Sequence, residues 1–181
     1  MLDVLEAQQK AVVDAVERSD FLLGAPVRFE DGTAGRLEGL EVGVEPWTVN
    51  ALLVGVGFLR HRTLRITIDT VDIATRGGIS LRTVPSKVEA VGRHYHPPEG
   101  GRILNREMRF NVAEGAIRRT GLDLGGLIID RATNQAIDFV GITLVGRRRV
   151  LVPAAQVAWQ APGWIWVDLG PDGLARASTY A

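Results

Sequence analysis

The sequence predicts an all-β protein made of two small β-barrels in tandem, with one α-helix in front of them. Short segments alternate apolar and polar residues, as half-buried strands do, and turns rich in glycine and proline separate them. Hydrophobic residues make up 46% of the 181 residues, which is enough to fill a folded interior. The pattern also recurs along the chain: 87 positions separate Leu37 from Leu124, and 86 separate Leu64 from Val150.

Composition excludes several classes of site. The 21 basic and 21 acidic residues balance, so the chain has no overall field to attract nucleic acid or an anionic membrane. It has no cysteine, which excludes disulfides, thiol nucleophiles and cysteine-ligated metals. No apolar run approaches the roughly 20 residues of a membrane-spanning helix, and the start of the chain does not resemble a signal peptide. We therefore expect a cytoplasmic protein with no membrane span and no cofactor.

Residues 1–20 are predicted to form an amphipathic helix. Leu2, Leu5, Val12 and Val16 recur at helical spacing, with polar residues between them. The apolar stripe is narrow, so we expect the helix to pack on a barrel or on a partner chain.

The first barrel is predicted over residues 24–85. Leu40, Val42 and Val44 alternate with Glu41 and Gly43, which predicts a strand with one solvent-facing side. Residues 49–58 are apolar on both faces, as in a covered central strand. Shorter strands are expected at residues 27–29, 64–69 and 79–81. Five such strands favour a closed or nearly closed barrel, because closure removes exposed edges.

A second barrel is predicted over residues 102–170, after a linker at residues 86–101 and before a tail at residues 171–181. Four features of the first unit recur in the same order, which indicates an internal duplication in which each unit encloses its own apolar interior. The matched segments are residues 37–40 with 124–127, 52–54 with 139–142, 64–71 with 150–157, and 79–81 with 165–167. Residues 105–121 are predicted either as a strand with an irregular loop or as partly helical.

The second unit resembles a PRC-barrel domain, the β-barrel of the photosynthetic reaction centre H subunit and of the C-terminal part of ribosome-maturation factors. The resemblance is carried by a glycine-rich strand at residues 125–130, a turn at 132–135, an apolar strand at 136–145, a basic turn at 146–149, and residues 150–153 with Val157. The first unit matches through Gly35, Gly39 and its long apolar strand. It departs from the pattern at residues 66–68, where a Val-Pro step would be expected.

The resemblance implies assembly or docking, since the family has no shared catalytic residues to transfer. We therefore expect a non-enzymatic interaction module that binds a protein partner and also self-associates. Nucleic acid is the less favoured partner. The chain contains no nucleophile-elbow, Walker or dinucleotide-binding motif.

Trp164 and Trp166 are the first candidates for contacts with a partner. If Ile165 and Val167 face the interior, the two tryptophans share the opposite face of the strand, where aromatic side chains often dominate interfaces. Packing against the other barrel or the N-terminal helix is the alternative.

Arg147, Arg148 and Arg149 are the second candidates. They could bind phosphate and so RNA, a ribosome or an anionic lipid surface. The alternative is that they belong to a solvated hairpin turn and keep a pair of strands soluble.

His94 and His96 are the candidate metal ligands. Residues i and i+2 of an extended segment point the same way, so both imidazoles could reach one ion if His61, Glu89 or Glu99 completed the site. A small-ligand or metal-binding domain that uses the linker is therefore the alternative function, against a solvated linker with two histidines.

Overall fold

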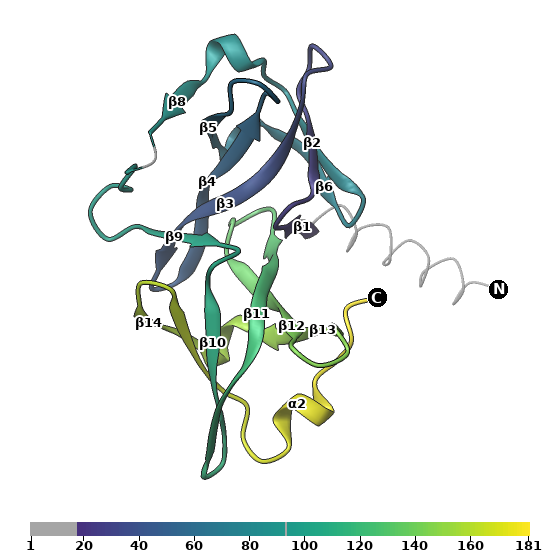
Figure 1. Cartoon of the computed structure of the whole chain (residues 1–181), viewed down its shortest axis with the longest axis vertical. Helices are drawn as coiled ribbons and strands as arrows, with labels where there is room; N and C mark the ends of the chain where they lie inside the picture. The colour runs from purple at the N-terminus through teal and green to yellow at the C-terminus, as the bar shows by residue number, and fades with distance from the viewer. Residues whose placement is uncertain (1–17, 93) are drawn as a thin grey trace, which may run out of the picture.

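The computed structural model describes residues 18–92 and 94–181, and most of them lie in strands that form two curled sheets, including a half-barrel (Figure 1). This confirms the predicted β-rich class. Most of the predicted helix lies outside the described residues. The predicted end of the helix was wrong, because residues 18–20 belong to strand β1 (Arg18–Leu22). Among the described residues, no helix has the length and apolar character needed to cross a membrane.

The first sheet is built mainly by residues 26–91, which we call lobe 1. Its order is β6-β7-β2-β3-β4-β5-β8, and the 3-10 helix η1 (Ile68–Thr70) connects β5 to β6. The pairs are antiparallel except β2 with β7, which is parallel. The bounds are β2 (Pro26–Arg28), β3 (Ala34–Val44), β4 (Trp47–Val56), β5 (Arg62–Thr67), β6 (Val71–Thr75), β7 (Gly78–Leu81) and β8 (Glu89–Val91).

The second sheet is built mainly by residues 109–168, which we call lobe 2, and it repeats this order as β14-β15-β10-β11-β12-β13. The 3-10 helix η3 (Ala154–Gln156) stands where η1 does in lobe 1, and β10 pairs with β15 in parallel. The bounds are β10 (Arg109–Glu114), β11 (Ile117–Asp130), β12 (Ala136–Thr143), β13 (Arg149–Pro153), β14 (Val157–Ala161) and β15 (Trp164–Asp168). Residues 105–121, left open by the sequence, contain β10 and the start of β11.

The strand that precedes each lobe pairs with the other lobe. β1 runs antiparallel to β11, and β9 (Arg102–Asn105), which the sequence assigned to the second unit, runs antiparallel to β3. Glycines permit these close approaches. A Cβ atom at Gly126, whose φ is +153°, would collide with the backbone oxygen of Phe21, and one at Gly39 would lie 3.1 Å from the backbone oxygen of Leu104.

The predicted linker and tail both add to sheet edges. β8 lies within the linker and pairs with β5. The tail begins with a short helix, α2 (Gly173–Arg176), and then runs beside β13. There the Leu151 amide donates to the Ser178 carbonyl (2.8 Å), and the Tyr180 amide donates to the Arg149 carbonyl (3.1 Å). Covering an edge in this way leaves fewer backbone groups free to pair with another chain.

The apolar interior is continuous, so the prediction of a separate interior in each half is wrong. A single cluster of buried side chains contains residues from strands of both sheets. Trp47 of β4 joins the two parts: its ring packs edge-on against Phe139 of β12, with centroids 5.1 Å apart. Its indole Nε1 also donates to the Val157 carbonyl (2.8 Å). An indole with both its ring and its N–H satisfied is a strong anchor between two sheets.

Candidate functional site

A buried ionic cluster lies on the outer face of lobe 1. Arg65 of β5 binds Glu41 of β3 through two parallel hydrogen bonds, Nε to Oε2 and Nη2 to Oε1, each 2.8 Å long. The Tyr95 hydroxyl donates to the same Oε2 (2.6 Å). Glu41 is only 2% exposed, although its neighbours in sequence alternate as if it faced solvent. We call Glu41, Arg65 and Tyr95 the polar triad.

Two segments explain why a carboxylate is buried at this position. β9 pairs edge to edge with β3, which places Ile103 beside Glu41, and the segment after β8 brings the Tyr95 hydroxyl to the Glu41 carboxylate. Arg65 holds the pKa of Glu41 below its ordinary value, mainly through its hydrogen bonds. Burial raises the pKa of Tyr95. The periodicity of β3 gave no signal of this cluster, because both segments come from far along the chain.

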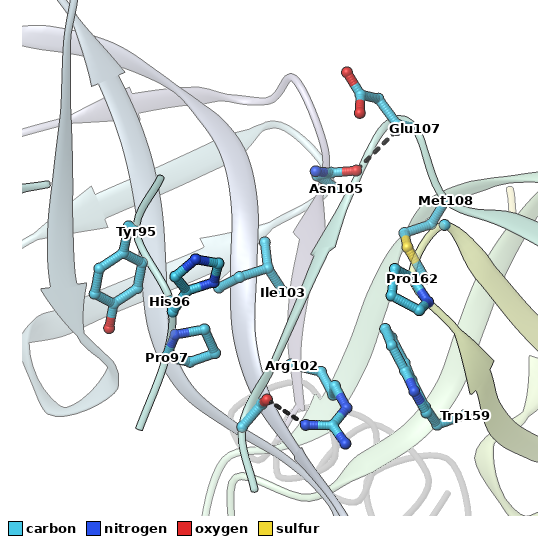
Figure 2. Close-up of a pocket in the computed structure, with 12 residues that line it drawn as sticks. Tyr95, His96, Pro97, Arg102, Ile103, Asn105, Glu107, Met108, Trp159 and Pro162 are labelled. Carbon is cyan, nitrogen blue, oxygen red and sulfur yellow. Dashed lines mark hydrogen bonds between the residues drawn. The ribbon is translucent and has the colours of Figure 1, made fainter. Parts of the chain in front are cut away.

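A pocket of about 560 Å³ opens beside the triad, between the two lobes. Its walls come from residues 95–108, which connect the two lobes and include β9, and from β14 with the turn that follows it in lobe 2. Figure 2 shows Ile103 on one side and Trp159 with Pro162 on the other. The full lining is Tyr95, His96, Pro97, Gly101, Arg102, Ile103, Asn105, Glu107, Met108, Trp159, Pro162 and Gly163.

One cation lies inside this pocket. The Arg102 guanidinium stands over the Trp159 ring, 5.2 Å from its centroid, and Nη1 donates to the Gly101 carbonyl (2.9 Å). Within the part of the chain that the structure describes, Arg102 forms no ion pair. Of the described residues that line the wall, Glu107 is the only carboxylate, and Figure 2 shows it at the far end of the pocket from Arg102. No pattern in the sequence pointed to Arg102, Trp159 or Ile103.

The two linker histidines are exposed, and His94 lies in a turn closed by the bond from the Tyr95 amide to the Gly92 carbonyl, so the segment is not the extended strand that the metal hypothesis requires. The structure does not bring a third ligand to them. His61 instead pairs with Glu38 (2.9 Å). Across residues 18–92 and 94–181, no three His, Cys, Asp or Glu side chains are grouped in a way that could hold a metal ion. His96 is part of the pocket wall.

The three arginines surround the turn between β12 and β13, and all are exposed. Arg147 bonds Asp123 (3.1 Å), and Arg148 donates to the Leu174 carbonyl (2.8 Å), so two of the three have partners within the chain. These bonds tie the turn to β11 and to α2, a structural role that the sequence did not predict.

Trp164 and Trp166 lie on the outer face of β15, as predicted. Ile165 and Val167 are fully buried, and both tryptophans are half-buried. The Arg118 guanidinium covers the Trp166 ring, 4.6 Å from its centroid. The face is therefore partly occupied by the protein itself.

Two hairpin tips carry the most exposed apolar side chains. Phe58 and Leu59 connect β4 to β5, and Leu144 and Val145 connect β12 to β13, the corresponding strands of lobe 2. Three of the four side chains are more than nine-tenths exposed, and Leu144 is about half exposed. The sequence analysis assigned Phe58, Leu144 and Val145 to strands and gave none of the four a role.

The chain matches no protein-family model, and a comparison with curated proteins found no significant relative. The folded arrangement and its exposed and hollow surfaces are thus the basis for a functional hypothesis.

Proposed function

We propose that this protein is a non-enzymatic interaction module of two PRC-barrel-like units that arose by duplication, and that it docks to a protein partner in the cytoplasm. Duplication is supported by the order that the six strands from β6 to β5 share with those from β14 to β13, and by the 3-10 helix at the same place in each sheet. The four recurring sequence features also fall on corresponding strands, β3 with β11, β4 with β12, β5 with β13, and β7 with β15.

The observation that carries the docking function is the exposure of bulky apolar residues at the two hairpin tips. Exposed pairs such as Phe58 with Leu59 add nothing to the interior, and contiguous exposed apolar groups mark interaction sites. Basic residues follow each pair, Arg60 and Arg62 in lobe 1 and residues 147–149 in lobe 2. An apolar tip beside basic side chains suits a partner surface with an apolar depression and an acidic rim.

Replacing the tip residues tests this proposal. Phe58→Ser with Leu59→Ser, and separately Leu144→Ser with Val145→Ser, should leave the free energy of unfolding within about 0.5 kcal/mol of the parent, because the side chains are in solvent. Partner capture from source-cell extract, quantified by mass spectrometry, or self-association in sedimentation velocity should fall strongly. Ile73→Ser and Ile137→Ser are matched controls, because both side chains are about half exposed but lie away from the tips. Equal capture by all variants would refute the role of the tips.

The outer face of β15 is the second contact surface in this proposal. Trp164→Ala with Trp166→Ala should weaken capture or self-association while circular dichroism and thermal unfolding still report a folded protein. If the double variant unfolds, the two tryptophans are structural, and this surface is removed from the proposal.

Association with RNA or the ribosome remains a less favoured alternative, because Arg147 and Arg148 already bond within the chain. It predicts salt-sensitive binding of RNA that Arg147→Glu with Arg149→Glu would abolish. RNA binding that is unchanged in this double variant would contradict the RNA or ribosome alternative.

A further inference from the structure

We infer that the pocket between the lobes binds a small organic anion with an aromatic or flat apolar body, a function additional to docking. The volume of about 560 Å³ lies within the range of sites for small molecules. Such sites combine mostly apolar walls with a few placed polar groups, and this pocket has both.

The pocket has two opposing apolar walls that could hold the apolar body of the ligand. Ile103 stands on one side, and Trp159 and Pro162 stand on the other, as Figure 2 shows; the buried Met108 side chain also lines the cavity. A flat ring between these surfaces would bury both of its faces. Ile103 belongs to β9, which pairs with the first sheet, whereas Trp159 and Pro162 belong to lobe 2, so lobe 2 alone could not form the site.

Arg102 supplies the charge that selects an anion. Among residues 18–92 and 94–181 it has no ion pair, and its one side-chain hydrogen bond, to the Gly101 carbonyl, uses Nη1 alone. That bond and the Trp159 ring hold the guanidinium in place before a ligand arrives. A fixed, unneutralised guanidinium presents a planar set of donors that fits a carboxylate or sulfonate. His96 and Asn105 add polar groups to the wall.

A second arginine–tryptophan pair gives a matched control. Arg118 covers Trp166 at a similar distance, 4.6 Å against 5.2 Å, but on the outer face of lobe 2 and not among the residues that line the pocket. Changes at Arg118 therefore remove the same kind of contact and the same charge without changing the pocket.

The test compares two fluorescent probes on the full chain, 1-anilinonaphthalene-8-sulfonate and its neutral analogue N-phenyl-1-naphthylamine. The parent should bind the sulfonate more tightly. Arg102→Gln should weaken sulfonate binding by about tenfold, the scale of one charge-assisted contact, and leave the neutral probe unchanged. Trp159→Ala should weaken both probes, and Arg118→Gln neither. Arg102→Lys, which keeps the charge but loses the fork, should fall between Arg102→Gln and the parent.

Urea unfolding of each variant confirms that it is folded before titration. The inference is overturned if the parent binds neither probe, if Arg102→Gln and Arg118→Gln weaken the sulfonate equally, or if the parent does not distinguish the two probes. None of these outcomes bears on the hairpin tips, so the docking proposal is tested separately.

Discussion

The two lobes solve one packing problem in different ways. On the outer face of lobe 1, the buried Glu41 of β3 forms an ion pair with Arg65 of β5, whose side chain is 22% exposed. The corresponding positions of lobe 2, judged by strand register, are Ile128 of β11 and Leu151 of β13, which pack in a small apolar cluster. A strand from outside each lobe pairs beside the central strand, β9 with β3 and β1 with β11.

A tyrosine closes both faces. Tyr95 donates to Glu41 in lobe 1, and Tyr180 donates to Asp20 of β1 in lobe 2 (2.7 Å). The accepting carboxylate, Glu41, lies on β3 of lobe 1 in the first case. In the second case the acceptor, Asp20, lies on β1, the strand that pairs with lobe 2 from outside it. Burial raises the pKa of Tyr180 to about 12, so both hydroxyls stay protonated donors at neutral pH. The comparison teaches that this face needs a filled, satisfied layer, and that ionic or apolar side chains can provide it.

The largest effect should come from breaking the ion pair. Arg65→Leu, which copies lobe 2, leaves the Glu41 carboxylate buried without its cation and should lower the free energy of unfolding by about 3–5 kcal/mol. Urea unfolding followed by circular dichroism measures it. The double variant Glu41→Ile with Arg65→Leu copies lobe 2 at both positions and should recover most of the loss, because apolar replacements of buried ion pairs are often neutral. A double variant as unstable as the single one would show that the two faces are not interchangeable.

Removing the tyrosine hydroxyls should sharpen the comparison at smaller scale. Tyr95→Phe removes one hydrogen bond from the Glu41 carboxylate, which is only 2% exposed. It should lower the free energy of unfolding by about 1.5–3 kcal/mol, the value for a hydrogen bond to a charged group. Tyr180→Phe should cost less, about 0.5–1.5 kcal/mol, because the Asp20 side chain is 14% exposed and also bonds Arg18. The same urea experiment measures both. Equal losses would contradict the difference in burial.

The two faces should also respond differently to acid. The folded protein binds a proton at Glu41 more weakly than the unfolded chain does, since the pKa lies below its ordinary 4.5. The stability that the triad adds is therefore present above about pH 4.5 and is lost as the pH falls through the lowered pKa. Unfolding free energies at pH 7 and pH 3.5 should show a smaller acid loss in the Glu41→Ile, Arg65→Leu double variant than in the parent. An unchanged acid loss would place its source outside the triad.

Asp138 of β12, opposite Ile128, should show the smallest effect and the opposite sign. Burial raises its pKa above the ordinary 3.8, so the folded protein binds this proton more tightly than the unfolded chain does. Stability from protonation is present below that value and is lost as the pH rises through the raised pKa. Asp138→Asn should therefore raise the urea midpoint slightly at pH 7 and change it little at pH 3. A decrease at pH 7 would mean that the carboxylate makes a favourable contact in the folded state.

The sequence predicted the parts of this structure that depend on local pattern. Alternation located β3, β5 and β15, and the inward positions Ile165 and Val167 are buried as expected. Alternation could not locate β1 or β9, because each strand is short and its partner strand is far away in the sequence. The same limitation concealed the site. Glu41 fits a solvent-facing position when β3 is considered alone, without β9 and Tyr95 beside it, and the pocket is built from two segments that lie far apart along the chain.

The reciprocal placement of β1 and β9 has a consequence for how the chain can be divided. A fragment that ends at residue 101 would keep β1 but lose β9, one of the partners of β3, and the fragment from residue 102 onward would keep β9 but lose β1, one of the partners of β11. Each piece thus carries the strand that the other requires. Neither should be stable alone, whereas the two pieces mixed together should reassemble, each completing the other's sheet.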